Sequence, residues 1–287
     1  MHLARRTRLW SKGLAKLSSI EENAHLVSGN NREPGRSVLS KGFAILSALR
    51  TAETGLTRPQ IARRTGLPMT TVLRIATELR DMGALELDDH GIYRLGAWLW
   101  ELGTLAASRS TLREIALPYM QDLYEATHEN VQLVVRDGYD ALIVERIRGP
   151  KSVLIVTRPG GRLPLHATGV GKALLAYEPM AFVDDVIARG LAQLTPHTIT
   201  DADVLRRDLA QVRKRGYSTT KDEMTIGAVS VGAAIFGPED QVVGAVSLVV
   251  ATKGAKPAAV APAVRAVANG LTRRVGIHWD TTIGSGQ

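Results

Sequence analysis

Apolar residues recur with helical spacing between residues 36 and 96, and this pattern predicts three short helices. The first begins at Val38, and its apolar stripe consists of Leu39, Phe43, Leu46 and Leu49. The third follows Pro68, and its apolar stripe consists of Val72, Ile75, Leu79 and Met82. One such stripe per helix allows the helices to pack on a shared core, so we expect these segments to form one small domain.

Local signals place a second helix between these two. Thr57, followed three residues later by Gln60, predicts a capping box, and Gly66 can end the helix in a left-handed conformation. After Gly83, two alternating segments flank a turn at residues 88–91 and predict a β-hairpin. Two short helices joined by a tight turn, with a hairpin behind them, indicate a winged helix-turn-helix over residues 36–96.

The polar face of the third helix suits DNA. It carries Thr70, Thr71 and Arg74, whose hydroxyls and guanidinium can meet base edges or adjacent phosphates in a major groove. Contacts to phosphates are expected mainly from Arg58, Gln60, Arg63 and Arg94. The alternative is a helix-turn-helix that never touches DNA and whose charges form a solvated face.

The distribution of charge favours an anionic partner for this domain. The net charge is +8, and residues 1–100 hold 15 of the 36 basic residues but only 9 of the 28 acidic ones. This asymmetry favours nucleic acid. The first twenty residues contain five basic residues and no acid, so we expect residues 1–35 to be a disordered basic arm, with a transit peptide as the alternative.

Composition excludes several other classes of protein. The chain has no cysteine, which rules out disulfides, thiolate nucleophiles and cysteine-ligated metals. No apolar run approaches the roughly 18–20 residues that span a bilayer, so we expect a cytoplasmic protein without a membrane partner. The histidines show no metal-ligand spacing, and we expect no metal, no cofactor and no catalytic residue.

Residues 97–106 are apolar nearly all round, and we expect a linker helix over residues 97–110 that is covered on most sides. The expected cover is the same helix from a second subunit, which would make the protein a homodimer; the alternative is burial against the chain's own larger domain. Thr111 and Glu114 predict a capping box for the next helix, which Pro118 should kink.

Beyond Glu129 the pattern changes to segments rich in β-branched residues. The expected strands cover residues 131–136, 141–147, 153–157, 216–221, 229–236 and 242–250. The expected helices cover residues 170–177, 179–189, 201–215 and 257–275. Strands in groups, separated by helices, indicate an α+β domain around a largely antiparallel sheet over residues 111–276, followed by a tail over residues 277–287.

Several segments match a known family in order along the chain. They are residues 55–68, 71–74, 93–96, 162–176 and 213–217, and residues 164–172 read Pro-Leu-His-Ala-Thr-Gly-Val-Gly-Lys. Over about residues 36–276 the chain thereby resembles the IclR family of bacterial transcription regulators. The resemblance implies a winged helix-turn-helix joined by a helix to a GAF-like domain, and dimers often paired into tetramers. It also implies that the protein binds double-stranded operator DNA beside a catabolic operon and responds to a small organic acid as effector.

The resemblance places the effector between the sheet and the segment around Thr168, Gly169 and Val170. Carried over by position, further contacts come from Thr220, Ser230 and Ser247. Relatives often have an acid at the position of Thr220, a cysteine at that of Ser230 and a proline at that of Ala234. These departures leave the identity of the effector open.

Elementary chemistry supports an anion site at the same place. Thr168, Gly169, Val170 and Gly171 lie at the start of a predicted helix, whose free N–H groups attract negative charge. The glycines let a ligand approach the backbone closely. The alternative is that both glycines merely let the helix pack tightly against the sheet.

Two other functions stay open from the sequence. The motif Gly-Val-Gly-Lys is not a phosphate-binding P-loop, because His166 and Ala173 stand where that loop needs a glycine and a hydroxyl residue. A hydrolase-like enzyme could use His166, Asp222 and Glu223 in the same cavity, although a structural role is the better interpretation of His166. The third interpretation is a ligand sensor that acts through protein contacts alone.

Overall fold

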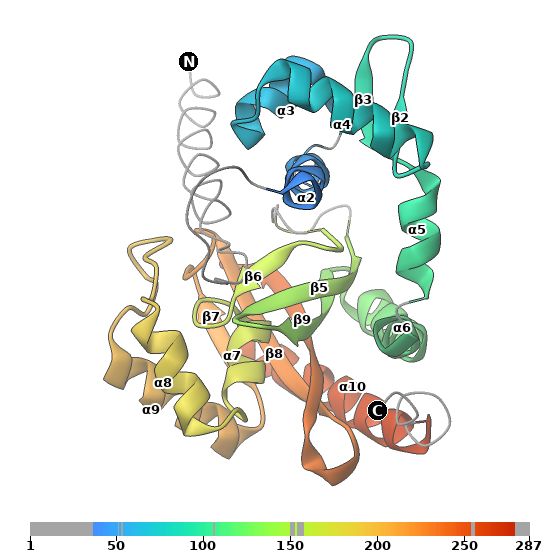
Figure 1. Ribbon diagram of the computed structural model, residues 1–287. Coiled ribbons are helices and arrows are strands. Elements are labelled where there is room, and N and C mark those ends of the chain that lie inside the picture. The colour runs from blue at the N-terminus through green and yellow to red at the C-terminus, as the bar shows by residue number, and fades with distance from the viewer. Residues whose placement is uncertain are drawn as a thin grey trace, which may run out of the picture. The chain divides into compact units, whose positions relative to one another are not determined.

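The computed structural model describes residues 37–50, 52, 54–105, 107–149, 153, 158–253 and 256–278. The chain divides into two compact units, Met1–Ala106 and Ala107–Gln287 (Figure 1). The expected basic arm over residues 1–35 lies outside the described residues. Most of the expected strand at 153–157 and residues 279–287 of the expected tail also lie outside them.

The first unit combines four described helices with a small antiparallel sheet. Its elements are α2 (Val38–Leu49), β1 (Leu56–Thr57), α3 (Arg58–Thr65), α4 (Met69–Asp81), β2 (Leu85–Leu87), β3 (Ile92–Leu95) and α5 (Ala97–Thr104). The strands pair in the order β1-β3-β2, so β2 and β3 form the predicted wing. Gly66, with φ of 68°, ends α3 in the predicted left-handed conformation and allows the tight turn into α4.

The core of the first unit lies where α2, α3 and α4 meet the small sheet. Our predicted stripe for α2 is correct for its second half and wrong for its first. Leu49 is buried and Leu46 packs against the core, whereas Leu39 and Phe43 are 71% and 57% exposed, and Gly42 and Ile45 are buried. α2 is apolar on more than one side, and the side with Gly42 faces Ile75 of α4. The predicted stripe of α4 also fails at its end, where Met82 lies beyond the last helical residue and is 65% exposed.

The second unit is built on a six-stranded sheet whose described pairs are all antiparallel, in the order β6-β5-β4-β9-β8-β7. Its helices are α6 (Ala107–Thr127), α7 (Gly169–Leu175), α8 (Met180–Ala188), α9 (Ala202–Arg215) and α10 (Pro257–His278). Its strands are β4 (Asn130–Asp137), β5 (Asp140–Ile147), β6 (Arg162–Pro164), β7 (Ser218–Lys221), β8 (Ala228–Phe236) and β9 (Val242–Ala251), with a short 3-10 turn at Pro238–Asp240.

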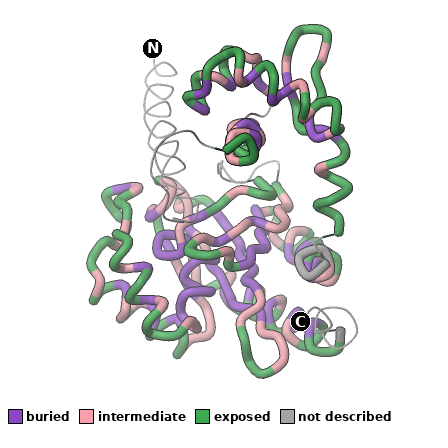
Figure 2. The backbone as a smooth tube through the Cα atoms, in the orientation of Figure 1, coloured by how far each residue is buried: buried purple, intermediate pink, exposed green. Residues whose placement is uncertain are grey.

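Successive side chains along each strand point to opposite faces of the sheet, and both faces are buried. Leu133 and Leu248 belong to the core shared with α6 and α10 on one face. Val134 and Ala245 belong to the core shared with α7, α8 and α9 on the other. Figure 2 shows the burial of the sheet and of α7, all seven residues of which are buried. The predicted α+β domain around an antiparallel sheet is thereby confirmed.

One local prediction for this unit needs correction. Thr111 and Glu114 do not cap α6, because the helix begins four residues earlier, at Ala107. Pro118 lies inside α6, and the helix continues past it to Thr127. The sequence pattern also missed β6, because a strand of three residues is too short to show alternation.

Candidate DNA-binding and effector sites

The outward face of α4 presents the residues predicted to read DNA. The buried residues of α4 lie on the opposite face of the helix, so Thr70 and Arg74 are exposed and Thr71 is half-buried. The Arg74 guanidinium donates to Glu78 Oε1 at 2.8 Å, one turn further along the helix. Both side chains are exposed by about half (55% and 51%), so this pair can open at little cost when a better partner arrives.

The wing positions its arginine in a similar way. Arg94 on β3 donates to Asp88 Oδ2 at 2.6 Å. Asp88 also accepts the backbone N–H groups of Ile92 and His90, at 2.9 and 3.0 Å, and thereby holds the turn. These hydrogen bonds, that from Ile92 first, together with the charge of Arg94, lower the pKa of Asp88. Asp88 is therefore ionised at neutral pH and keeps Arg94 on the wing.

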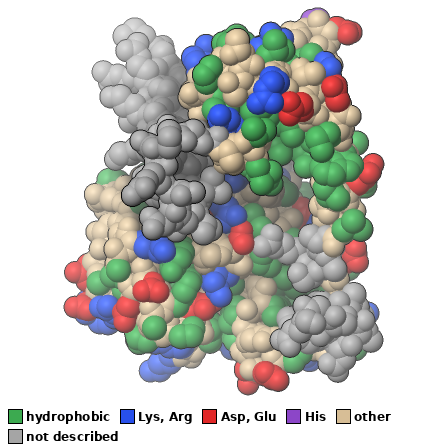
Figure 3. Space-filling view, viewed as in Figure 1, with side chains coloured by type: hydrophobic (Ala, Val, Ile, Leu, Met, Phe, Trp, Pro, Cys, Tyr) green, Lys and Arg blue, Asp and Glu red, His purple; other side chains and the backbone are tan. Residues whose placement is uncertain are grey.

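The remaining predicted phosphate contacts lie on α3. Gln60 accepts the Thr57 N–H at 2.7 Å through Oε1, which confirms the capping box and leaves its amide nitrogen for other contacts. Arg63 is exposed and Arg58 is half-buried. Figure 3 shows basic side chains on the surface of the first unit, with acidic and apolar ones among them.

The predicted linker helix ends early and is uncovered. α5 ends at Thr104, and none of its residues is buried in the described structure. Trp100 is 73% exposed and Trp98 and Leu102 are exposed by 42% and 45%. Exposed apolar residues at this density are typical of an interface with another chain.

In the second unit, the start of α7 packs directly on β8. A Cβ at Gly169 would lie within 3.0 Å of the Cβ of Ser230, and a Cβ at Gly232 would lie 2.7 Å from the Gly169 carbonyl oxygen. Thr168 caps the helix, because its Oγ1 accepts the Gly171 N–H at 3.1 Å. The glycines therefore serve the close packing of helix on sheet, and one of the expected anion-binding amides already has a partner.

Strand register brings the predicted effector residues together with others that sequence reasoning missed. Next to the start of α7, one row across the sheet reads Arg146, Gln132, Ser247, Gly232 and Ser218, from β5 to β7. The adjacent row reads Asn130, Val249, Ser230 and Thr220, from β4 to β7. Because alternate residues of these strands belong to the core with α6 and α10, both rows face the α7 side. Polar side chains thus gather on this face of the sheet.

Two of these polar groups are buried without a partner. Ser247 and Asn130 are both 0% exposed, and Ser247 Oγ and Asn130 Oδ1 have no hydrogen-bond partner within the described part of the chain. The Asn130 amide nitrogen donates to the Val153 carbonyl oxygen at 2.9 Å. A buried polar atom left unsatisfied costs about 1–3 kcal/mol, so a polar partner bound at these atoms would stabilise the protein. The signal in the sequence that could have revealed this polar face is the pair Asn130 and Gln132, two polar residues at alternate positions of an otherwise apolar segment.

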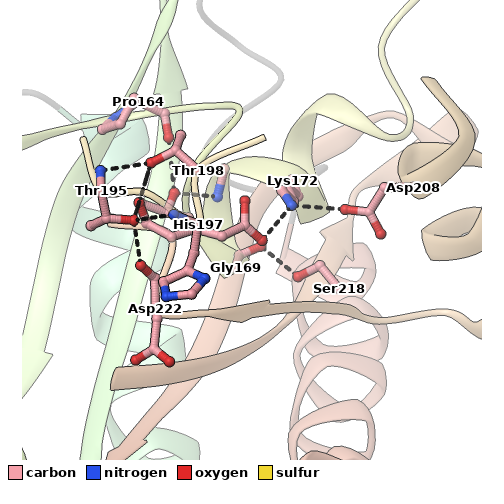
Figure 4. Close-up of polar contacts among 12 residues, drawn as sticks. Pro164, Gly169, Lys172, Thr195, His197, Thr198, Asp208, Ser218 and Asp222 are labelled. Atoms are coloured by element: carbon pink, nitrogen blue, oxygen red, sulfur yellow. Dashed lines mark hydrogen bonds and ion pairs between the residues drawn. The ribbon is translucent and has the colours of Figure 1, made fainter. Parts of the chain in front are cut away.

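Lys172 of α7 is the centre of a buried ion network that ties the helix to its surroundings (Figure 4). Lys172 is 0% exposed, and its Nζ lies 2.8 Å from both Asp208 Oδ2 on α9 and Glu223 Oε1 after β7. Arg215 adds a second cation 3.8 Å from Asp208. Burial raises the pKa of Glu223, against the opposing effect of Lys172. Lys172 is thus engaged within the protein, in agreement with the rejection of a P-loop.

The three residues considered for a hydrolase all have structural partners. His166 Nε2 lies 3.0 Å from the Ala192 carbonyl oxygen, and burial lowers the pKa of this histidine. Asp222 Oδ1 accepts from the Gly227 N–H at 2.7 Å and from the Thr252 hydroxyl at 2.9 Å. Glu223 pairs with Lys172. These contacts hold loops and helices in place.

Among the described residues, no group of three or more histidine and carboxylate side chains is arranged to hold a metal ion. No helix in the described ranges combines the length and the hydropathy that crossing a membrane requires.

Comparisons with known proteins cover both units. The family model for the IclR helix-turn-helix domain matches residues 38–89, and that for the bacterial transcriptional regulator IclR C-terminal matches residues 104–273. The chain is 34% identical to the HTH-type transcriptional regulator KipR of Bacillus subtilis over 194 residues, which cover 67% of this chain and 78% of KipR. It is 30% identical to the HTH-type transcriptional repressor AllR of Escherichia coli over 220 residues, which cover 75% of this chain and 80% of AllR.

Solved structures give the same result. An IclR homolog from Microbacterium hydrocarbonoxydans, complexed with 4-hydroxybenzoate, has a TM-score of 0.78 at 30% identity and covers 83% of this chain and 99% of its own. The IclR protein of Thermotoga maritima has a TM-score of 0.70 at 27% identity and covers 83% of this chain and 98% of its own.

Proposed function

The chain belongs to the IclR family of ligand-responsive, DNA-binding transcription regulators, and we propose how its two units divide this function. The first unit reads an operator, and the second binds a small organic acid that alters operator affinity. The observation that carries the proposal is that the chain has both features: an exposed polar face on α4 in the first unit, and a polar, partly unsatisfied face of the sheet in the second.

Base readout is assigned to α4. Thr70, Thr71 and Arg74 contact base edges or the adjacent phosphates, and Arg74 leaves Glu78 to donate to a guanine in the major groove. Arg58, Gln60, Arg63 and Arg94 contact mainly phosphates and set the orientation on the duplex. The support is the exposure of α4 on this side and the placement of Arg94 on the wing.

Substitution of Arg74 tests this assignment. The operator is first obtained by selection from random duplexes, and affinities are measured by fluorescence anisotropy at fixed salt. Arg74→Ala should weaken operator binding by about 1–3 kcal/mol and relax the preference at one base pair. Arg80→Ala is the matched control on the same helix, because Arg80 is exposed and pairs with Asp81. Equal affinity and equal base preference of the two folded variants would contradict the assignment.

Two copies of α5 are proposed to pair in a homodimer, and such dimers can assemble into tetramers. Pairing would cover the exposed tryptophan and leucine side chains of this helix. A two-fold dimer also places two recognition helices about one helical turn apart, roughly 34 Å, on a palindromic operator.

The effector site is proposed on the sheet face beside the start of α7. Thr220, Ser230 and Ser247 supply hydroxyls from three neighbouring strands, and the segment Thr168–Gly169–Val170–Gly171 borders them. Because α7 has seven residues and Thr168 already caps it, side chains of the sheet must provide most of the recognition. The carboxylate in the Microbacterium relative's complex supports an organic acid.

A ligand screen tests the effector proposal. A carboxylate present at one hundred times its dissociation constant should add about 2.7 kcal/mol to the stability of the protein. The same compound should change operator affinity by about 1–3 kcal/mol, the usual coupling between two sites. A compound that stabilises the protein without any effect on operator binding would not be the effector.

The finer parts of the proposal follow from the family. The protein is proposed to act in the cytoplasm and to regulate a nearby catabolic operon in response to its effector. We assign it no enzymatic activity. The structural partners of His166, Asp222 and Glu223 support the last point. Turnover of a stabilising carboxylate by the pure protein would overturn it.

A further inference from the structure

The positive charge at the start of the chain lies mostly outside the helices and the sheet of the first unit. Residues 1–36 hold seven basic and three acidic residues, a net charge of +4, whereas residues 37–105 hold eight and seven, a net charge of +1. Three arginines of the second range already pair with acids at 2.6–2.9 Å, namely Arg74 with Glu78, Arg80 with Asp81 and Arg94 with Asp88. By themselves, residues 37–105 therefore attract a polyanion only weakly.

We propose that the basic arm, residues 1–35, is a second DNA-binding element, which contacts phosphates beside the operator without reading their sequence. Its first twenty residues contain no acid and five cations, which are Arg5, Arg6, Arg8, Lys12 and Lys16. The two family models begin after the arm, at residues 38 and 104, so the family pattern does not include this element. The inference goes beyond the proposed readout by α4, because the arm supplies affinity whereas α4 supplies specificity.

The arm is attached where it can reach the DNA that the first unit binds. Lys16 is separated by 21 residues from Val38, the first residue of α2. A chain gains at most about 3.3–3.6 Å per residue, so this connection spans up to roughly 75 Å, which is about two turns of a DNA duplex. Because the arm is tethered to a bound protein, its cations meet the neighbouring phosphates at a high effective concentration.

An anionic membrane is the rival partner for the arm. The apolar residues Leu9, Trp10 and Leu14 lie among the cations and can enter a lipid interface. DNA is favoured because the arm leads into a DNA-binding unit whose residues 37–105 carry a net charge of only +1. Attraction to the phosphate backbone, which supplies most of the sequence-independent affinity of such proteins, must then come largely from the arm.

The test measures binding of the full-length protein to a random-sequence duplex and to the selected operator, by fluorescence anisotropy at several salt concentrations. In the arm variant, glutamine replaces all five cations of the first twenty residues. Each phosphate contact contributes about 0.9 to the slope of log affinity against log salt, so the slope should decrease by about 2–4.5 per chain. At about 0.1 M salt, both duplexes should bind roughly tenfold or more weakly and by the same factor, because phosphate contacts carry no sequence information.

A matched control removes the same charge from the second unit. It replaces five exposed basic residues by glutamine, namely Arg207, Lys214, Lys221, Lys253 and Lys256. Exposed charges that make no contact are largely screened at this salt, so the control should bind both duplexes within about twofold of the parent protein.

The length of the duplex gives a second readout. Flanks of about two helical turns on each side of the operator should tighten binding of the parent protein relative to a duplex trimmed to the site, because they supply the phosphates that the arm contacts. The arm variant should bind the trimmed and the flanked operator equally well.

The inference is wrong if the arm variant keeps the salt slope of the parent protein, if it binds like the matched control, or if flanks tighten its binding as much as that of the parent. Co-sedimentation with vesicles of phosphatidylcholine and phosphatidylglycerol tests the rival partner. Vesicle binding that is lost in the arm variant, together with unchanged DNA binding, would assign the arm to a membrane and overturn the inference.

Arg74→Ala separates this inference from the proposed function. It should weaken binding to the operator and leave binding to the random duplex unchanged, whereas the arm variant weakens both. If Arg74→Ala binds the operator as well as the parent protein does while the arm variant behaves as expected, readout by α4 is overturned and the role of the arm stands. The opposite result overturns the role of the arm alone.

Discussion

Lys172→Met should destabilise the second unit by about 3–5 kcal/mol, the usual cost of removing one partner from a buried ion pair. The Lys172 ammonium is fully buried and lies 2.8 Å from the carboxylates of both Asp208 and Glu223. Methionine fills nearly the same volume, so the effect reports the lost charge and not a cavity.

The loss of stability in Lys172→Met arises mainly from Glu223. The carboxylate of Asp208 keeps Arg215 at 3.8 Å and is 21% exposed, whereas Glu223 is only 8% exposed and Lys172 is its partner. Without that cation, Glu223 must stay ionised at high cost or take up a proton. For a folding unit of 150–250 residues, each kcal/mol shifts Tm by about 2–4 °C, so we expect a fall of about 6–20 °C.

Differential scanning calorimetry at neutral pH measures this change. Lys221→Met is the matched control, because Lys221 is exposed on β7, and it should stay within about 0.5 kcal/mol of the parent protein. Adding Glu223→Gln to Lys172→Met should recover part of the loss, since it removes the stranded carboxylate. If Lys172→Met unfolds within about 1 kcal/mol of the Lys221→Met protein, the network does not stabilise the fold as argued.

Three further substitutions have defined outcomes. Leu102→Asp on α5 should reduce both the dimer fraction in light scattering and operator affinity, and a fully dimeric variant would exclude α5 as the interface. Gly169→Ala should cost about 1–3 kcal/mol in denaturant unfolding, because its Cβ would crowd the facing serine of β8. Gly276→Ala, on α10 with no neighbour within 4 Å, should cost nothing and can stabilise the protein by up to about 1 kcal/mol. Burial lowers the pKa of His166 below its ordinary value of 6.5, so the unfolded chain takes up this proton first and stability falls as pH drops below that value. His166→Gln should flatten this fall relative to His90→Gln, and parallel stability–pH curves for the two variants would refute the shift.

Sequence reasoning succeeded where a few adjacent residues decide the conformation. The Thr57–Gln60 capping box, the left-handed Gly66 and the wing hairpin each depend on groups within a few positions of one another. It failed on the first half of α2, because a helix with apolar residues on several sides allows more than one stripe, and only packing in the folded unit selects the buried one.

The candidate site shows the same limit at longer range. Lys172 pairs with acids 36 and 51 positions further along the chain, a distance at which no periodicity links them. The polar face of the sheet depends on register, which sets Arg146 beside Gln132 and Ser247 across three strands. The motif from Thr168 to Gly171 had two interpretations, an anion site or close packing. The contacts of Gly169 with β8 and the cap on Gly171 show that packing already uses this backbone. We therefore propose that recognition of a ligand depends on side chains on the sheet, where the unsatisfied atoms of Asn130 and Ser247 lie.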